Sequence, residues 1–381
     1  MIETVLFDVD GVLLSEERYF DASALTVWEL LYSNNYLGLN PKAFKTDLQD
    51  DDISQIREQV FQNDLVLKLM KARGLNANWD MIYLAFSHQL IHLLSQIRDV
   101  EQSLINDWLA QDINRETLSA MKAIFAKYQL RIDYGAFIED FKQTNAEKEE
   151  LLTFLNHVAE QKLGVKTTIF KRQSSLWDIC EHASQEWYVG DENIVASTGK
   201  TSVQNGKPGF LNDEKTIGEP EAIGRLFQSL KDEGVSIGIG TGRPELETIE
   251  PFKHLGWLDY FDKDRIVTAD DVLHAERDYP EHMPLAKPNP FSFIASLLGK
   301  QTPVIDCITK TLPLKNAERV LIVGDSLADL YAAKEIGCRF AAVLTGLSGK
   351  AARADFEAQN ADYILDHVLD VRGLITDLKE N

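Results

Sequence analysis

Short, almost continuously apolar runs that end in polar, glycine-containing turns recur along the chain. They are TVLFDVDG (4–11), VSIGIGTGR (235–243), RVLIVGDS (319–326) and FAAVLTG (340–346). Such runs are typical of strands buried on both faces, as in the parallel sheets of α/β proteins. Helical spacing separates them, as in PEAIGRLFQSLKDEG (220–234), which opens with proline and closes with glycine, and in LADLYAAKEIG (327–337). The pattern predicts an α/β domain with a parallel sheet.

The chain between the first and second predicted strands has a different pattern, dominated by amphipathic helical runs with few strand-like segments. Examples are ASALTVWELLYSNNYL, DISQIREQVFQNDLVLKLMKARG, WDMIYLAFSHQLIHLLSQI and EKEELLTFLNHVAEQKLG. A stretch rich in Gly, Ser, Thr and Asn (190–220) is expected to return the chain to the core. We therefore expect two domains, a core of residues 1–15 and 212–381 and a helical domain of residues 16–211.

The composition narrows the classes of partner. With 60 acidic and 39 basic residues the net charge is -21, which repels nucleic acid and anionic membranes, so a small-molecule partner is expected. The three cysteines are scattered, which fits a reducing compartment and argues against a zinc site. There is no secretory pattern and no run near the roughly 18 apolar residues of a membrane span. We expect a cytoplasmic protein, whose oligomeric state the sequence leaves open.

Carboxylates follow two of the predicted strands. Asp8 and Asp10 stand two positions apart on a segment expected to be extended, so they point the same way and repel unless a positive group lies between them. Asp325 follows another strand, and Asp329 lies one helical turn later on the same face. In sheets of this kind ligands bind beyond the carboxyl ends of the strands, where these residues are expected.

Four motifs at these strand ends resemble, in order, those of the haloacid dehalogenase-like (HAD) superfamily. They are DVDGV, GTGR, the lysine of AKPNP, and GDSLAD. The resemblance implies a Rossmann-like α/β core with a C1-type cap inserted after the first strand. The insertion, residues 16–211, is much larger than the usual small helical cap, so the substrates of common caps are not carried over.

The resemblance also implies residue roles. Asp8 is expected to be the nucleophile and Asp10 the general acid and base. The hydroxyl of Thr241 and the backbone N–H of Gly242 are suited to bind phosphoryl oxygens. Lys287 is expected to offset the phosphate charge and orient the nucleophile. Arg243, beside this turn, is interpreted as a structural ion-pair residue and left out of the catalytic set.

The carboxylates also predict a metal. At about 4 Å and an effective dielectric near 20, each pair of like charges costs on the order of 4 kcal/mol, so a cation is needed among them. Mg²⁺ prefers a few carboxylates together with water and phosphate oxygens. We expect Asp8 and Asp325 to bind it, Asp10 to contribute its backbone carbonyl as in the family, and Asp329 to bind it directly or through water.

The predicted function is a Mg²⁺-dependent phosphatase that hydrolyses a small phosphorylated metabolite through an aspartyl-phosphate intermediate. Asp10 argues against a dehalogenase, which has no use for a protonated acid there. Three alternatives stay open. One is a phosphomutase of the β-phosphoglucomutase type, although LSEERYFD departs from the Asp-Thr-x-x-x-His pattern of that group. Another is a phosphonatase, which would need a Schiff-base lysine from the cap. The third is a regulatory or binding protein without catalytic activity.

Overall fold

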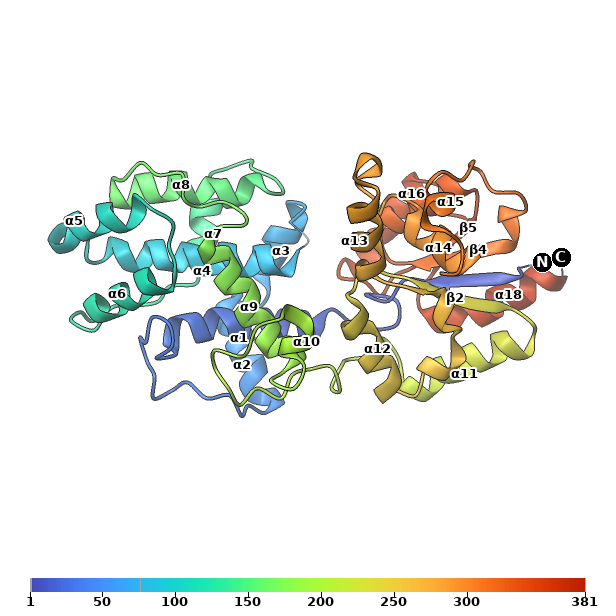
Figure 1. Ribbon diagram of the computed structural model, residues 1–381, viewed down its shortest axis with the longest axis horizontal. Coiled ribbons are helices and arrows are strands. Elements are labelled where there is room, and N and C mark those ends of the chain that lie inside the picture. The colour runs from blue at the N-terminus through green and yellow to red at the C-terminus, as the bar shows by residue number, and fades with distance from the viewer. Residues whose placement is uncertain (1, 76, 381) are drawn as a thin grey trace. The chain divides into compact units, whose positions relative to one another are not determined.

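The computed structural model describes residues 2–75 and 77–380, and the chain divides into two compact units (Figure 1). The core unit comprises Met1–Glu16 and Leu211–Asn381, and the helical unit comprises Glu17–Phe210. The large helical insertion after the first strand is thus a compact unit of its own.

The core unit is built on a parallel sheet that, in the described residues, has six strands in the order β3-β2-β1-β4-β5-β6. The strands are β1 Thr4–Phe7, β2 Ser236–Gly240, β3 Ile266–Val267, β4 Val320–Gly324, β5 Arg339–Val343 and β6 Tyr363–Leu365. The predicted α/β fold and its four predicted strands are confirmed. The sequence analysis missed β3 and β6, because strands of two and three residues are too short to show a period.

The central strand, β1, is apolar throughout because helices cover both faces of the sheet. Val5 and Phe7 belong to one buried cluster, and Leu6 belongs to the cluster on the other face. The first cluster includes side chains of α11 Pro220–Asp232, α12 Glu245–His254 and α18 Val371–Glu380. The second includes side chains of α13 Ala269–Asp278, α14 Phe291–Leu298, α15 Val304–Ile308, α16 Leu327–Ile336 and α17 Arg353–Ala358.

Short 3-10 helices complete the connections of the core unit. They are η1 Leu258–Tyr260, η2 Lys263–Arg265, η3 Pro280–His282, η4 Ala317–Arg319, η5 Gly349–Ala352 and η6 Val368–Asp370. The register of the sheet places Phe7 level with Ile239 of β2 and with Val323 of β4. The carboxyl ends of β2, β1 and β4 therefore meet at one edge, and the predicted motif residues other than Lys287 follow these ends.

The helical unit contains α1 Glu17–Tyr32, α2 Asp50–Val60, α3 Leu65–Ala72, α4 Asn78–Ser95, α5 Arg98–Leu109, α6 Arg115–Phe125, α7 Ala136–Phe141, α8 Glu150–Leu163, α9 Ser175–Val189 and α10 Ile194–Thr198. The run from residue 52 to residue 74, treated as one helical pattern, is two helices. Gln62, Asn63 and Asp64 break it, because all three adopt positive φ values.

A buried ionic cluster lies inside the helical unit. Lys207, in the segment that returns toward the core unit, places its Nζ 2.6 Å from Oε2 of Glu29 and 2.7 Å from Oε2 of Glu186. All three side chains are inaccessible to solvent, and Lys207 Nζ lies 5.0 Å from the centroid of the Trp187 ring. Burial raises the pKa of Glu29 to about 7, against the opposing influence of Lys207. This cluster, Glu29–Lys207–Glu186, fastens the returning segment to α1 and α9.

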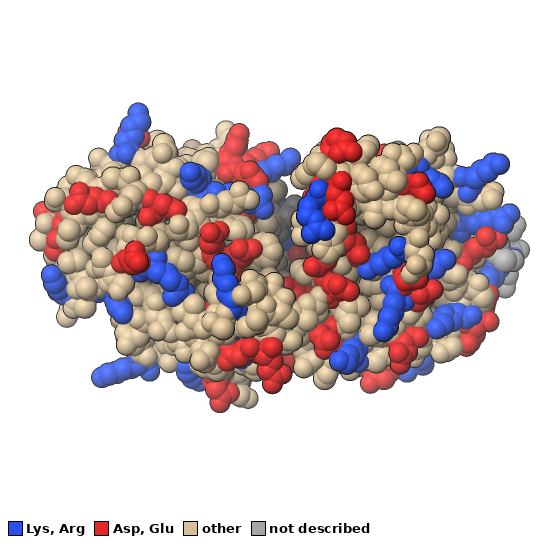
Figure 2. Space-filling model, in the orientation of Figure 1, with Lys and Arg blue, Asp and Glu red and all other residues tan. Residues whose placement is uncertain are grey.

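Acidic and basic side chains are interspersed over the face shown in Figure 2, and the basic side chains in view do not gather in one patch. Among the described residues, every helix is too short or too polar to cross a membrane.

Candidate active site

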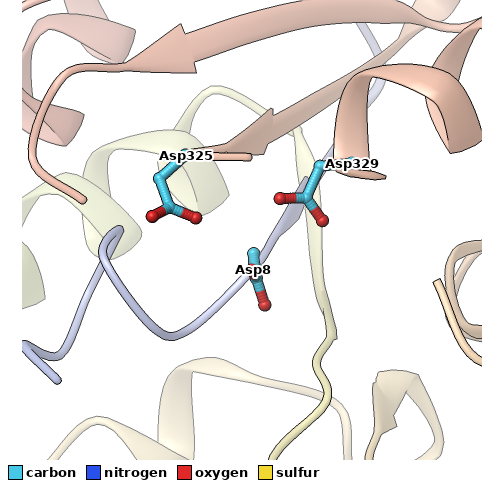
Figure 3. Close-up of side chains that lie close together, drawn as sticks. All are labelled: Asp8, Asp325 and Asp329. Carbon is cyan, nitrogen blue, oxygen red and sulfur yellow. The ribbon is translucent and has the colours of Figure 1, made fainter. Parts of the chain in front are cut away.

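Three carboxylates converge at the carboxyl end of the sheet (Figure 3). Asp8 follows β1, Asp325 follows β4, and Asp329 lies in the first turn of α16. One oxygen from each lies within 4.8 Å of the others. Asp8 and Asp329 are buried and Asp325 is partly buried. The structure therefore brings together three of the four residues that the sequence assigned to a metal.

Local structure fixes Asp8 and Asp329. The backbone N–H of Asp8 donates to the carbonyl of Val323 at 2.9 Å, which continues the ladder between β1 and β4 by one residue. Ser326 caps α16, since its Oγ accepts from the N–H of Asp329 at 3.3 Å and donates to Oδ2 of Asp329 at 2.7 Å. Position 324 must be glycine, because a Cβ there would lie 2.6 Å from Oδ2 of Asp329.

Lys287 joins this group from the loop before α14. Its Nζ lies 2.9 Å from Oδ1 of Asp8 and 2.7 Å from Oδ1 of Asp329, with the ring centroid of Phe293 at 4.6 Å. Burial lowers the pKa of Lys287, but the carboxylates of Asp329 and Asp8 more than compensate and raise it overall. Lys287 is therefore a charged group inside the cluster rather than a solvated loop residue.

The acids of this cluster resist ionisation. Burial raises the pKa of Asp8 from 3.8 to about 7; Lys287 opposes this shift, and the charges of Asp329 and Asp10 add to it. Burial also raises the pKa of Asp325 well above its ordinary value, together with the charges of Asp8 and Asp329. The donors are all carboxylate oxygens, which suit a hard divalent cation, and its charge would favour their ionised forms. The residues present fit such an ion.

The side chain of Asp10 lies outside the group of three carboxylates and is bound by Arg243. The expectation of an extended segment through Asp10 is wrong, because β1 ends at Phe7 and the chain bends at Val9, before the turn at Gly11, whose φ is 69°. Nε of Arg243 donates to Oδ1 of Asp10 at 2.7 Å. Burial raises the pKa of Asp10, and Arg243 opposes the shift. Asp8 and Asp10 thus each face a basic side chain of their own, and the metal-binding role of the Asp10 carbonyl stays a prediction.

Thr241 and Gly242 follow β2 at the same edge. Thr241 is buried, and its Oγ1 accepts from the backbone N–H of Arg243 at 3.1 Å. Gly242 is exposed, and a Cβ there would meet nothing within 4 Å. The turn leaves open space where a side chain of residue 242 would stand, and the phosphate-binding roles of both residues stay predictions.

A close approach between two loops around Asp325 was not predicted from the sequence. Oγ1 of Thr345, after β5, donates to the carbonyl of Gly11 at 2.6 Å. A Cβ at Gly346 would lie 1.9 Å from Oδ2 of Asp325, and one at Gly11 would lie 2.2 Å from it. The carboxylate of Asp325 therefore fits only between two glycine backbones, and the TG pair after the fourth predicted strand was the signal for it.

We expect Gly346→Ala to weaken the binding of a divalent cation about tenfold, as substitutions around metal ligands do, because the methyl group displaces the Asp325 carboxylate. Calorimetric titration with Mg²⁺ measures this. Gly373→Ala is the control, since a Cβ at that exposed position of α18 meets nothing within 4 Å. Equal affinity in the two variants would contradict the role given to Gly346.

Known proteins resemble this chain in sequence and in structure. A family model described as HAD-hydrolase-like matches residues 285–371, which include Lys287, Asp325 and Asp329. A crystal structure of a Northeast Structural Genomics Consortium target has a TM-score of 0.91 and 39% identity, with 100% of both chains covered.

The curated relatives match a smaller part of the chain. Pyrophosphatase PpaX of Bacillus cereus (strain AH820) is 29% identical over 168 residues, which are 44% of this chain and 64% of that protein. Pyrophosphatase PpaX of Bacillus mycoides (strain KBAB4) is 30% identical over 165 residues, which are 43% of this chain and 62% of that protein. The chain thus spans less than two thirds of the length of either relative.

Proposed function

Since this chain belongs to the haloacid dehalogenase-like (HAD) superfamily, we propose that it is a phosphatase that transfers the phosphoryl group of a small phosphate ester first to Asp8 and then to water. The observation that carries the proposal is the convergence of Asp8, Asp325 and Asp329 around Lys287 at the carboxyl end of the sheet. Binding alone does not require a buried lysine among three clustered carboxylates, so this arrangement favours an enzyme over a regulatory protein.

The first chemical step uses Asp8 and Asp10. A carboxylate oxygen of Asp8 attacks phosphorus, the bond between phosphorus and the ester oxygen breaks, and Asp10 gives a proton to the departing oxygen. In the second step Asp10 takes a proton from water, the water oxygen bonds to phosphorus, and the bond to Asp8 breaks. Inorganic phosphate leaves, and both carboxyl groups return to their starting states.

The phosphoryl group is bound by Lys287, Thr241 and Gly242. The ammonium group of Lys287, 2.9 Å from Oδ1 of Asp8, offsets the negative charge that the substrate brings. Asp8, Asp325, Asp329 and the Asp10 carbonyl would hold Mg²⁺, which when bound neutralises charge on the phosphoryl oxygens. Thr241 and Gly242 donate hydrogen bonds to the same oxygens.

The proposed substrate is a small soluble phosphorylated metabolite, and pyrophosphate belongs among the candidates because the relatives are named pyrophosphatases. We assign the helical unit, Glu17–Phe210, the role of a cap that selects the substrate. Nucleic acid and membranes are not proposed as partners. A cytoplasmic location is proposed on the ground of the free cysteines.

The test is a panel of phosphate esters, sugar phosphates and pyrophosphate assayed with Mg²⁺. Release of inorganic phosphate supports the proposal. Conversion of a sugar phosphate to its isomer without phosphate release would favour the phosphomutase. If neither an aryl phosphate nor any other member of the panel is hydrolysed, the result would favour the binding protein.

We expect a chelator to stop hydrolysis and Mg²⁺ to restore it, with Ca²⁺ at least about tenfold less effective. Ca²⁺ accepts more ligands at longer distances, so it would engage both oxygens of Asp8 and leave neither to attack. Rates measured after chelation and readdition of each ion provide the check. Equal rates with the two ions would contradict the metal assignment.

A further inference from the structure

Arg243, left out of the catalytic set, connects the proposed general acid to the segment on which the chain re-enters the core unit. Its side chain is 1% exposed. Nε donates to Oδ1 of Asp10 at 2.7 Å, and Nη1 donates to Oε1 of Glu214 at 2.7 Å. Nη1 also donates to the backbone carbonyl of Glu247 at 3.1 Å. The guanidinium group therefore spans two acids and a helix backbone.

The backbone of Arg243 is fixed as firmly as its side chain. Its N–H donates to Oγ1 of Thr241 at 3.1 Å, and its carbonyl accepts from the N–H of Ala269 at 2.8 Å. The guanidinium group thus starts from a rigid turn at the end of β2. The carboxylate of Asp10, by contrast, is 31% exposed and sits in a turn, so the bond to Arg243 restricts it.

Glu214 belongs to the returning segment, which pairs with the departing one. Leu14 and Thr216 form an antiparallel bridge. The N–H of Ser15 donates to the carbonyl of Lys215 at 2.7 Å, and the N–H of Ile217 donates to the carbonyl of Leu13 at 3.0 Å. The side chain of Glu214 is 1% exposed, so its ion pair with Arg243 is buried beside this pairing.

We propose that Arg243 is a positioning residue for Asp10, and that Glu214 holds Arg243 in place, so that the orientation of the general acid is tied to the segment on which the chain returns to the core unit. Binding at Oδ1 directs Oδ2 of Asp10 to proton transfer. Arginine bonds Asp10 through Nε and Glu214 through Nη1, two donors held in one planar fork, and the single ammonium group of lysine does not reproduce this fixed geometry. The inference rests on the proposed phosphatase function.

A misplaced general acid has a specific kinetic consequence. An alkyl ester loses a strongly basic alkoxide and needs the proton, whereas p-nitrophenolate leaves as a stable anion and needs it much less. The value of kcat/KM reports the steps up to release of the alcohol, before the aspartyl-phosphate is hydrolysed. Loss of positioning therefore lowers kcat/KM more for the alkyl ester than for the aryl ester.

The experiment compares kcat/KM of Arg243→Lys, Glu214→Gln and the wild-type protein for β-glycerophosphate and p-nitrophenyl phosphate with Mg²⁺. For Arg243→Lys we expect a loss about tenfold larger with the alkyl ester than with the aryl ester. Glu214→Gln is expected to show the same preference to a smaller extent. Arg372→Gln, which removes an exposed charge from α18, is the control and should leave both values unchanged.

Equal losses for the two esters, or none, would overturn the inference, because a defect of folding or phosphate binding does not depend on the leaving group. If thermal melting shows that Arg243→Lys is unfolded, Glu214→Gln decides by the same criterion, since glutamine keeps the shape of the side chain. A wild-type protein that hydrolyses neither of these esters nor any member of the phosphate panel refutes the proposed function itself, and this result requires no variant.

Discussion

Asp8→Asn is expected to reduce turnover by several orders of magnitude and to leave the fold intact. An amide nitrogen and a neutral amide oxygen do not attack phosphorus as a carboxylate does, and loss of a nucleophile costs this much in other enzymes. The variant keeps the side-chain oxygen that accepts from the N–H of Val9 at 2.8 Å. It also removes one buried acid beside Asp325 and Asp329, so in the absence of metal it should be at least as stable as the wild-type protein.

The measurements are the rate with p-nitrophenyl phosphate and the melting temperature in a chelator. Asp355→Asn, at an exposed position of α17, is the control and should change neither. Activity of Asp8→Asn within about tenfold of the wild-type rate would assign the nucleophile to another residue.

The sequence predicted most of the site because its residues are placed by regular structure. Asp8, Thr241 and Asp325 each follow a strand long enough to be recognised, and the parallel register then brings the ends of these strands together. The place of Lys287 beside the nucleophile was implied only by the resemblance. Its loop has no period, and its contact with Asp8 and Asp329 depends on how α14 packs against the sheet.

Two errors share a local cause. The segment through Asp10 was predicted to be extended, and residues 52–74 were predicted to form one helical pattern. In the first place the chain bends at Val9 before Gly11 takes a positive φ, and in the second the backbone takes positive φ values at residues 62–64. Glycine signals such a change, and Asn63 and Asp64 are residue types that adopt it readily, but the helical spacing of apolar residues on either side of them concealed the break.

The sequence also did not predict the ion pairs between residues that lie far apart along the chain. Arg243 meets Asp10 across 233 positions of the sequence, and Lys207 meets Glu186 across 21. Lys207 stands in NGKPG, whose composition indicates a solvated turn. The Glu29–Lys207–Glu186 cluster can be recognised only after α1, α9 and the returning segment have been packed together.

We expect Lys207→Met to destabilise the helical unit by about 3–5 kcal/mol, the cost of breaking a buried ion pair by removing one partner. Methionine fills the space beside Trp187 but leaves Glu29 and Glu186 without their shared cation. Urea unfolding followed by tryptophan fluorescence measures the loss. Lys200→Met, at an exposed position, is the control. A loss below about 1 kcal/mol would mean that water or another group compensates the two carboxylates.

A second substitution separates charge from packing. If the loss is electrostatic, adding Glu29→Gln to Lys207→Met should recover part of it, because one uncompensated charge disappears while the volume stays nearly constant. Lower pH should act in the same direction. The pKa of Glu29 is raised from 4.5 to about 7, so in this window the folded protein holds a proton that the unfolded chain has released, and stability falls as pH rises. Without Lys207 the ionised form loses its partner, so the deficit of Lys207→Met should be larger at pH 8 than at pH 5. A deficit independent of pH and of Glu29→Gln would assign the role of Lys207 to packing against Trp187.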